Sequence, residues 1–91
     1  MGKKEKVTRV IDGDTFKTNR RKKSVRLANV DTPEKGQPGY AGAKDKLKKL
    51  IGGKDVRVEP VAKDKYGRTV AKVYSGRESV NKKMNKGSKK K

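Results

Sequence analysis

The apolar residues of this chain form short runs that switch between a period of two and the period of an α-helix. Residues 7–11 and 15–18 are two such runs, and the Asp-Gly pair at 12–13 between them is a strong hairpin signal. A third run at residues 25–30 alternates as a strand does and places Arg26 on the face opposite its apolar neighbours. The first third of the chain therefore predicts three short strands.

A helix and two more strands are predicted next. The apolar side chains of residues 43–51 recur at the spacing of one helical face, and the glycine pair at 52–53 is a typical helix stop. Residues 56–59 and 69–74 alternate again, and Pro60 either closes the fourth strand or marks a sheet edge. The order is thus three strands, a helix and two strands.

The last predicted element is a short helix in which Val80 and Met84 are one turn apart and Gly87 is the expected stop. A small antiparallel sheet with too few residues for two layers can hide its edges by curling, and a helix between the third and fourth strands can close one end. The predicted fold class is therefore mainly β: a five-stranded Greek-key barrel, the OB-fold, with one helix between strands three and four and a short C-terminal helix.

We expect residues 1–5 to be a basic extension, 6–86 the folded domain and 87–91 a basic disordered tail. Only 29% of the 91 residues are hydrophobic, so the core is modest and a bound ion or ligand would help stability.

Cysteine and histidine are absent, which leaves carboxylates, arginines and lysines for any chemistry. The start of the chain lacks the apolar core of a signal peptide, so we expect a cytoplasmic protein or a processed secreted form.

The formal net charge of +18, from 28 Lys and Arg against 10 Asp and Glu, points to polyanionic partners. The segment NRRKK at residues 19–23 suits an exposed loop. Nucleic acid is the expected partner, with single strands preferred. A membrane is not expected, because no basic amphipathic helix with a large apolar face is present. So much like charge also favours a monomer.

Three turn segments contain the candidate chemistry: IDGDT at 11–15, VDTPE at 30–34 and DKYGR at 64–68. Taken singly, each is most simply a turn, with Gly67 supplying a positive φ in the last. Arg26 either extends outward from its strand or belongs to a functional site.

Considered together, the turns have another interpretation. The strand ends of a curled barrel can bring five charged side chains to one place: Asp14, Asp31, Glu34, Arg26 and Arg68. Carboxylates from two turns suit a hard cation such as calcium. Two arginines suit the charge of a pentacoordinate phosphate, and a carboxylate that does not bind the metal could orient or deprotonate a water. These are the parts of a metal-assisted phosphodiesterase.

The motifs VIDGDTF, VRLANVDTPE, PGYAGA, LIGGKDVRVE, DKYGRTVAKVY and VN occur in order from about Val7 to Asn81. In these the chain resembles the staphylococcal nuclease (thermonuclease-like) family. The resemblance implies an OB-fold and a calcium-dependent, sequence-nonspecific nuclease that cleaves DNA and RNA to 3′-phosphorylated products.

The resemblance also implies roles for individual residues. It assigns the calcium ligands to the carboxylates of Asp14 and Asp31 and to the backbone carbonyl of Thr32. It assigns activation of the attacking water to Glu34, and transition-state stabilisation at the scissile phosphate to Arg26 and Arg68. Lys65 and Tyr66 match positions that contact the terminal phosphate of a bound nucleotide. We expect Asp12 and Gly13 to shape the turn and support Asp14 from behind.

Two alternatives stay open on the sequence alone. A non-catalytic OB-fold module would bind nucleic acid in a salt-dependent manner that is indifferent to calcium. Its candidate stacking residues are Phe16, Tyr40, Tyr66 and Tyr74. A small structural or chromatin-coating protein would need only the charge, but it gives no reason for acids and arginines at these particular positions.

Overall fold

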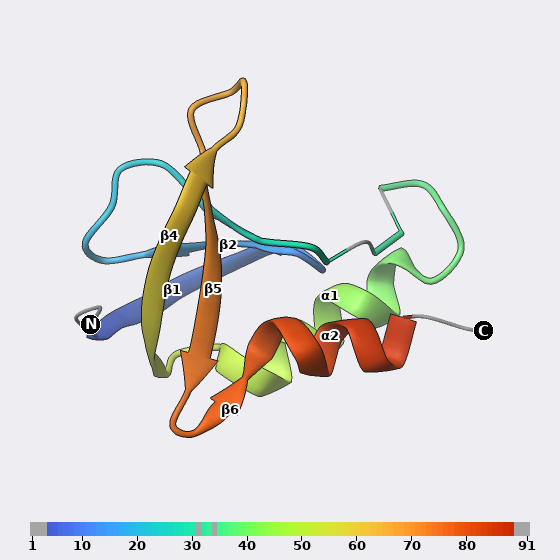
Figure 1. Ribbon diagram of the computed structural model, residues 1–91. Helices are drawn as coiled ribbons and strands as arrows, with labels where there is room; N and C mark the ends of the chain where they lie inside the picture. The colour runs from blue at the N-terminus through green and yellow to red at the C-terminus, as the bar shows by residue number, and fades with distance from the viewer. Residues whose placement is uncertain (1–3, 31, 34, 89–91) are drawn as a thin grey trace.

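The computed structural model describes residues 4–30, 32–33 and 35–88, and it forms a closed barrel with two helices at one end (Figure 1). The elements in chain order are β1 (Lys4–Asp12), β2 (Thr15–Thr18), β3 (Val25–Leu27), α1 (Tyr40–Ile51), β4 (Asp55–Lys63), β5 (Thr69–Ser75), β6 (Glu78–Ser79) and α2 (Val80–Ser88). The strand order in the sheet is β3-β2-β1-β4-β5-β6. A parallel pairing between β3 and β5 closes the barrel, with Val25 opposite Thr69 and Leu27 opposite Ala71. The predicted OB-fold class is confirmed.

The observed strands differ from the predicted ones in four places. β3 ends at Leu27 and does not extend to residue 30, because residues 28–29 form a turn in which Asn29 has a positive φ of 58°. β4 does not end at Pro60 but runs on to Lys63, with a register shift between Pro60 and Ala62 that accommodates the proline. Its pairing with β1 covers only residues 55–57, so Pro60 lies where β4 has only β5 as a partner. A sixth strand, β6, has two residues, too few for the sequence pattern to predict. β1 begins at Lys4, so residues 4 and 5 belong to the sheet.

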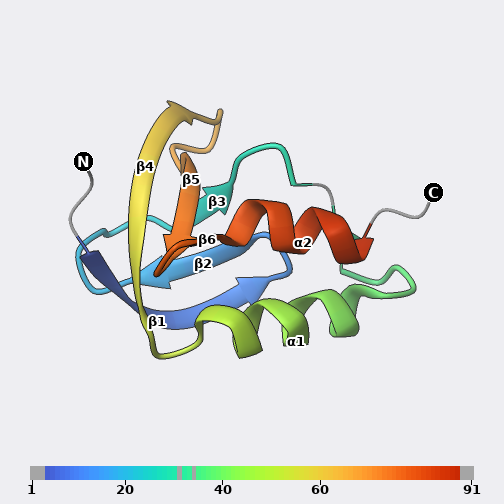
Figure 2. The same cartoon turned by 60° about the horizontal axis from the view of Figure 1, so that its bottom comes forward.

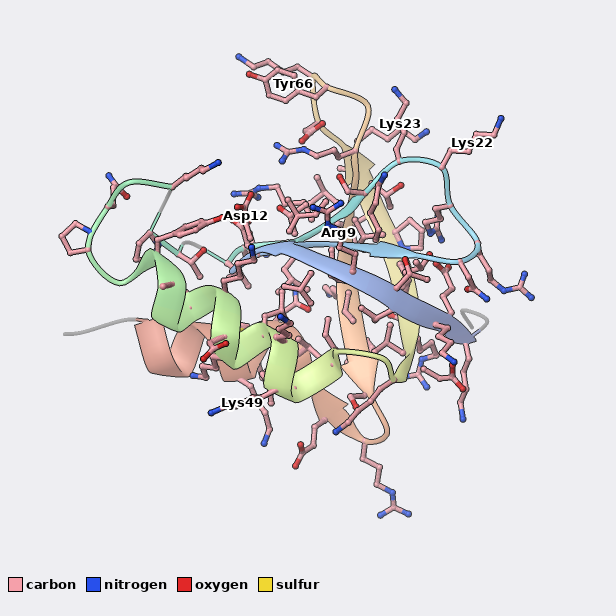
Figure 3. The ribbon with its side chains drawn as sticks, turned by 180° about the vertical axis from the view of Figure 1, so that it is seen from behind. Arg9, Asp12, Lys22, Lys23, Lys49 and Tyr66 are labelled. Carbon is pink, nitrogen blue, oxygen red and sulfur yellow. The ribbon has the colours of Figure 1, made fainter. Side chains whose placement is uncertain are left out.

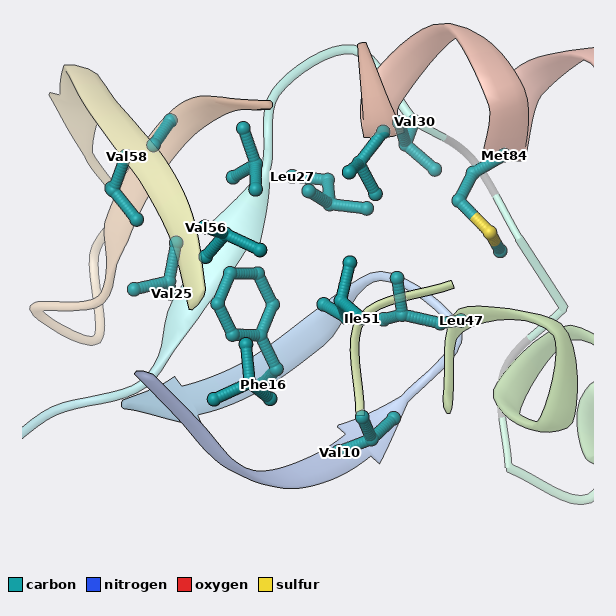
Figure 4. Packing of buried hydrophobic residues seen from close by; sticks show 14 residues of the cluster. Val10, Phe16, Val25, Leu27, Val30, Leu47, Ile51, Val56, Val58 and Met84 are labelled. Atoms are coloured by element: carbon teal, nitrogen blue, oxygen red, sulfur yellow. The ribbon is translucent and has the colours of Figure 1, made fainter. Parts of the chain in front are cut away.

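The core forms where the alternating strand residues meet the two helices. Phe16 is fully buried, with Val25 of β3 and Val56 of β4 beside its ring, and Leu47 and Ile51 of α1 close the helical end (Figure 4). Val25 and Leu27 are buried while Arg26 between them is half-exposed, as the alternation predicted. The apolar residues of a small chain are thus concentrated in one contiguous cluster.

The two helices lie side by side across the end of the barrel (Figure 2). Val80 and Met84 bury one face of α2 as predicted, although the helix does not stop at Gly87 and ends at Ser88. The Asn81 amide joins α2 to β5 and to the turn after β3: its Oδ1 accepts from the Val73 N–H at 2.8 Å, and its Nδ2 donates to the Ala28 carbonyl at 2.8 Å. Among the described residues, neither helix has the length and apolar character needed to cross a membrane.

Candidate active site

Strand pairing brings Asp14 and Arg26 together. Thr15 of β2 is opposite Arg26 of β3, and the Leu27 N–H donates to the Asp14 carbonyl at 2.8 Å. The Arg26 Nη2 lies 3.4 Å from the Asp14 Oδ2, while the Thr15 hydroxyl donates to the Asp14 Oδ1 at 2.9 Å. The side chains of Asp14 and Arg26 keep 16% and 33% of their surface exposed, so both remain open to a ligand.

Gly13 sets how closely the β1–β2 turn approaches the rest of the site. A Cβ built on Gly13 would lie 2.7 Å from the Ala43 Cβ and 3.0 Å from the Thr32 Oγ1. Gly13 is not among the positive-φ glycines, so glycine is needed here for space rather than for backbone conformation. The absence of a side chain therefore allows the turn that presents Asp14 to pack directly on Thr32.

Tyr40, the first residue of α1, supports this turn from the other side. Its hydroxyl donates a 2.6 Å hydrogen bond to the Asp12 Oδ1 and lies 3.3 Å from the Ile11 carbonyl oxygen. The bond to Asp12 raises the pKa of the Tyr40 phenol, with smaller contributions from burial and from the negative charge of Asp12. Asp12, two residues before Asp14, is thus held by a hydrogen bond to the first residue of α1.

Arg68 is held by its own turn. The Asp64 Oδ1 accepts the backbone N–H groups of Tyr66 and Arg68, both at 2.9 Å, and the Asp64 Oδ2 accepts the Arg68 Nε. Burial raises the pKa of Asp64, but these hydrogen bonds and the charge of Arg68 outweigh it and leave the pKa below its ordinary value. Gly67 has the predicted positive φ, at 83°. The turn therefore fixes the direction of the Arg68 side chain.

These segments surround one cavity of about 710 Å³ at the barrel surface. Its lining includes five predicted site residues: Asp12, Asp14, Arg26, Thr32 and Arg68. Gly13 is buried behind the cavity, and Lys65 and Tyr66 lie on the β4–β5 turn outside its lining. The predicted residues Asp31 and Glu34 lie outside the described residues. Within the part of the chain that is described, no group of three or more acidic residues gathers at one point.

The cavity lining also contains residues that sequence reasoning missed. Cations extend around its rim at Arg9, Lys35 and Lys44, and Tyr40 forms part of its wall. Arg9 and Asp12 both come from β1 (Figure 3). Alternation along β1 did not reveal Arg9, because it would place Arg9 on the buried face with Val7, and a register shift between these two residues turns Arg9 outward. No local pattern indicates that Tyr40 reaches Asp12, since 28 residues separate them.

The aromatic residues are less available for stacking than the sequence suggested. Phe16 is fully buried in the core, and Tyr40 is engaged with Asp12. Tyr74 packs against Arg57, whose guanidinium carbon lies 4.9 Å from the ring centroid. Of the four candidates, Tyr66 is the one left with an open ring, at 66% exposure.

Comparison with known proteins supports a single family. The model of the staphylococcal nuclease homologue family matches residues 24–87. An uncharacterized endonuclease of Escherichia coli is 42% identical over 72 residues, covering 77% of this chain and 47% of the relative. The thermonuclease of Staphylococcus hyicus is 38% identical over 91 residues, covering 89% of this chain and 54% of the relative.

The micrococcal nuclease of Shigella flexneri is 41% identical over 71 residues, covering 76% of this chain and 41% of the relative. The chain spans about half the length of these curated relatives. The family match extends over more than half of the chain and includes Arg26, Thr32 and Arg68 of the cavity. This chain belongs to the staphylococcal nuclease homologue family.

Proposed function

We propose that this chain is a calcium-dependent, sequence-nonspecific nuclease that hydrolyses DNA and RNA to 3′-phosphorylated products. The observation that carries the proposal is that Asp14, Arg26, Thr32 and Arg68, from four separate segments, line the same cavity. A carboxylate beside two arginine side chains is a combination that suits a bound phosphodiester with a cation. The names of the relatives, which are nucleases, support the same reaction class.

The donor set fits calcium. Each Asp14 oxygen has one partner, Thr15 or Arg26, and a carboxylate offers about four acceptor sites, so Asp14 retains the capacity to bind a cation. The proposed ligands are the carboxylates of Asp14 and Asp31 and the backbone carbonyl of Thr32. Hard oxygen donors from irregular turns are what calcium accepts. When bound, the ion supplies positive charge against a phosphate oxygen.

The protein groups would then act on the phosphodiester as follows. Glu34 orients the attacking water and takes its proton, the new bond forms between water oxygen and phosphorus, and the P–O5′ bond breaks. The leaving oxygen takes up a proton from solvent water and ends as a 5′-hydroxyl, the phosphate stays on the 3′ side, and Glu34 returns the proton that it took to solvent. Arg26 and Arg68 donate to the equatorial oxygens, where negative charge increases in the transition state. Lys65 and Tyr66 would contact the terminal phosphate of a bound nucleotide.

The first test is cleavage of single-stranded DNA at mildly alkaline pH, with and without millimolar calcium. Arg26→Ala and Arg68→Ala should each lower turnover by about 100-fold or more, with a smaller effect on binding, because each acts mainly in the transition state. The Arg26→Ala preparation also controls for contaminating nuclease. Equal losses of binding and rate would contradict the assigned roles.

A binding module without catalysis is the second candidate, favoured by the net charge of +18, which alone attracts polyanions. It predicts binding that survives chelation of calcium and no cleavage under any metal condition. The same experiment therefore separates the two candidates.

A further inference from the structure

The basic segment between β2 and β3 contains two kinds of cation. Arg21 turns inward, and its Nε and Nη2 lie 3.0 Å and 2.9 Å from the Glu5 carboxylate oxygens. Arg20 donates from its Nε to the Lys4 carbonyl at 3.3 Å. Both arginines therefore hold the segment onto β1. The prediction of an exposed loop at residues 19–23 did not include these contacts.

Glu5 is the anchor of this arrangement. Its side chain is only 6% exposed, and its Oε1 also accepts from the Thr18 hydroxyl at 2.8 Å. A buried carboxylate is unfavourable unless it is paired, so Arg21 is committed to Glu5 and is not free for a ligand. The anchor fixes where the remaining cations of the segment can extend.

Those remaining cations are Lys22 and Lys23, and both are exposed. The Lys23 side chain crosses the β4–β5 turn: a Cβ built on Gly67 would lie 3.2 Å from the Lys23 Nζ and 3.4 Å from its Cδ. Two loops that are far apart in sequence therefore meet at this point. Lys22, Lys23 and Tyr66 project at the same end of the molecule, far from Lys49 on α1 (Figure 3).

The β4–β5 turn adds an aromatic surface. Tyr66 is 66% exposed, and its ring has the Lys65 Nζ at 5.5 Å and the Arg68 guanidinium carbon at 5.4 Å from its centroid. Arg68 also lines the cavity, so it is common to the cavity and to this surface. We call Lys22, Lys23, Lys65 and Tyr66 the basic arm.

We propose that the basic arm is an extended subsite that binds the backbone of a single strand leaving the cavity past Arg68, with Lys22 and Lys23 contacting phosphates beyond those at Lys65 and Tyr66. The strand is single because an exposed ring such as that of Tyr66 can stack only on an unpaired base. The inference rests on the proposed nuclease function for its direction, since the cavity is where the strand would be cleaved.

The test compares Lys22→Gln/Lys23→Gln with the control Lys49→Gln/Arg77→Gln. Both double variants remove two charges from exposed side chains, and the control sites lie on α1 and on the β5–β6 turn, opposite the β4–β5 turn (Figure 1). Binding of a fluorescent oligothymidylate is measured by anisotropy in chelator over a series of salt concentrations, so that no cleavage interferes. A duplex of equal length is measured in parallel.

The Lys22→Gln/Lys23→Gln protein, called the arm variant, should reduce the slope of log affinity against log salt by about 1.4. Each phosphate contact to a single strand contributes about 0.7 to that slope. The control should change the slope by less than half as much. Equal slopes in the two variants, or a loss that is as large for the duplex, would overturn the subsite.

Cleavage is measured separately with calcium, on a long single strand and on a dinucleotide too short to reach Lys22 and Lys23. The arm variant should raise KM for the long strand about tenfold, because removing two phosphate contacts lowers the affinity by about this factor at low salt. The rate on the dinucleotide should be unchanged. A wild-type protein that binds through the arm but never cleaves would refute the proposed function and leave the arm intact. Cleavage by the wild-type protein, together with an unaltered salt slope in the Lys22→Gln/Lys23→Gln variant, would refute the arm and leave the proposed function intact.

Discussion

The Tyr40 hydroxyl donates a 2.6 Å hydrogen bond to the Asp12 Oδ1, joining the first residue of α1 to the last residue of β1. Asp12 is two residues before Asp14, so the contact holds the turn that presents the proposed calcium ligand. Groups that orient a metal ligand from behind typically alter metal affinity without touching the metal. We therefore expect Tyr40 to act as a positioning residue, and its effect on calcium tests this role.

Replacement of Tyr40 by Phe should weaken calcium activation. We expect the calcium concentration for half-maximal cleavage to rise by less than about tenfold, because direct partners of metal ligands contribute 10- to 100-fold and Tyr40 acts on Asp14 only through Asp12. Tyr74→Phe is the matched control, since that ring packs on Arg57 away from the cavity. A Tyr40→Phe protein with an unchanged calcium dependence would contradict the role.

Gly13→Ala should destabilise the fold and displace Asp14. The new methyl group would meet the Ala43 Cβ at 2.7 Å, and overpacking of this kind costs about 1–3 kcal/mol. Thermal unfolding should show a melting temperature lower by about 4–8 °C for each kcal/mol lost. In an Ala43→Gly background the same Gly13→Ala change should cost less, because the Cβ that it meets is absent.

Gly42→Ala is the control for this prediction. Gly42 lies in α1, and a Cβ there would find nothing within 4 Å. Alanine is favoured over glycine in a helix by about 1 kcal/mol, so this neighbouring substitution should stabilise the protein. Destabilisation by both alanines would mean that the close approach of Gly13 is not the cause.

The Glu5–Arg21 pair should contribute to stability through Glu5 burial. Arg21→Met would leave the 6% exposed carboxylate without its ion-pair partner, at a cost of about 2 kcal/mol after allowance for the partial exposure of Arg21. Urea unfolding measures the change. Glu5→Gln/Arg21→Met should lose less stability than Arg21→Met alone. A loss in the double variant equal to the sum of the two single losses would show that the two side chains are not coupled.

Asp64 should make stability depend on acid pH. Its pKa is lowered in the folded state, so its contribution is present above the unfolded value of about 3.9 and is lost as pH falls through the folded value. Asp64→Asn should therefore lower the melting temperature at neutral pH, and the difference from wild type should shrink below about pH 4. Asp45→Asn on α1 is the exposed control, and a difference that persists into acid would contradict the linkage.

Local patterns predicted most of the elements because their causes are local. Alternation determined which face of β3 is buried, and the glycine pair at 52–53 determined the end of α1. At Pro60 the second of the two predicted alternatives holds, because β4 continues past the proline through a register shift and has only β5 as a partner there. The pattern failed at Gly87, which α2 includes, because helix formation continues one residue beyond it.

The sequence by itself determined that this chain is a small, strongly basic barrel and which residue types are available for phosphodiester chemistry. Only the tertiary structure decided which cations of the basic run are free, because Arg21 is paired with the buried carboxylate of Glu5 whereas Lys23 is exposed beside Gly67. It likewise decided that Tyr40 supports Asp12. Such contacts join residues far apart in the chain, and barrel closure rather than local propensity brings them within hydrogen-bonding distance.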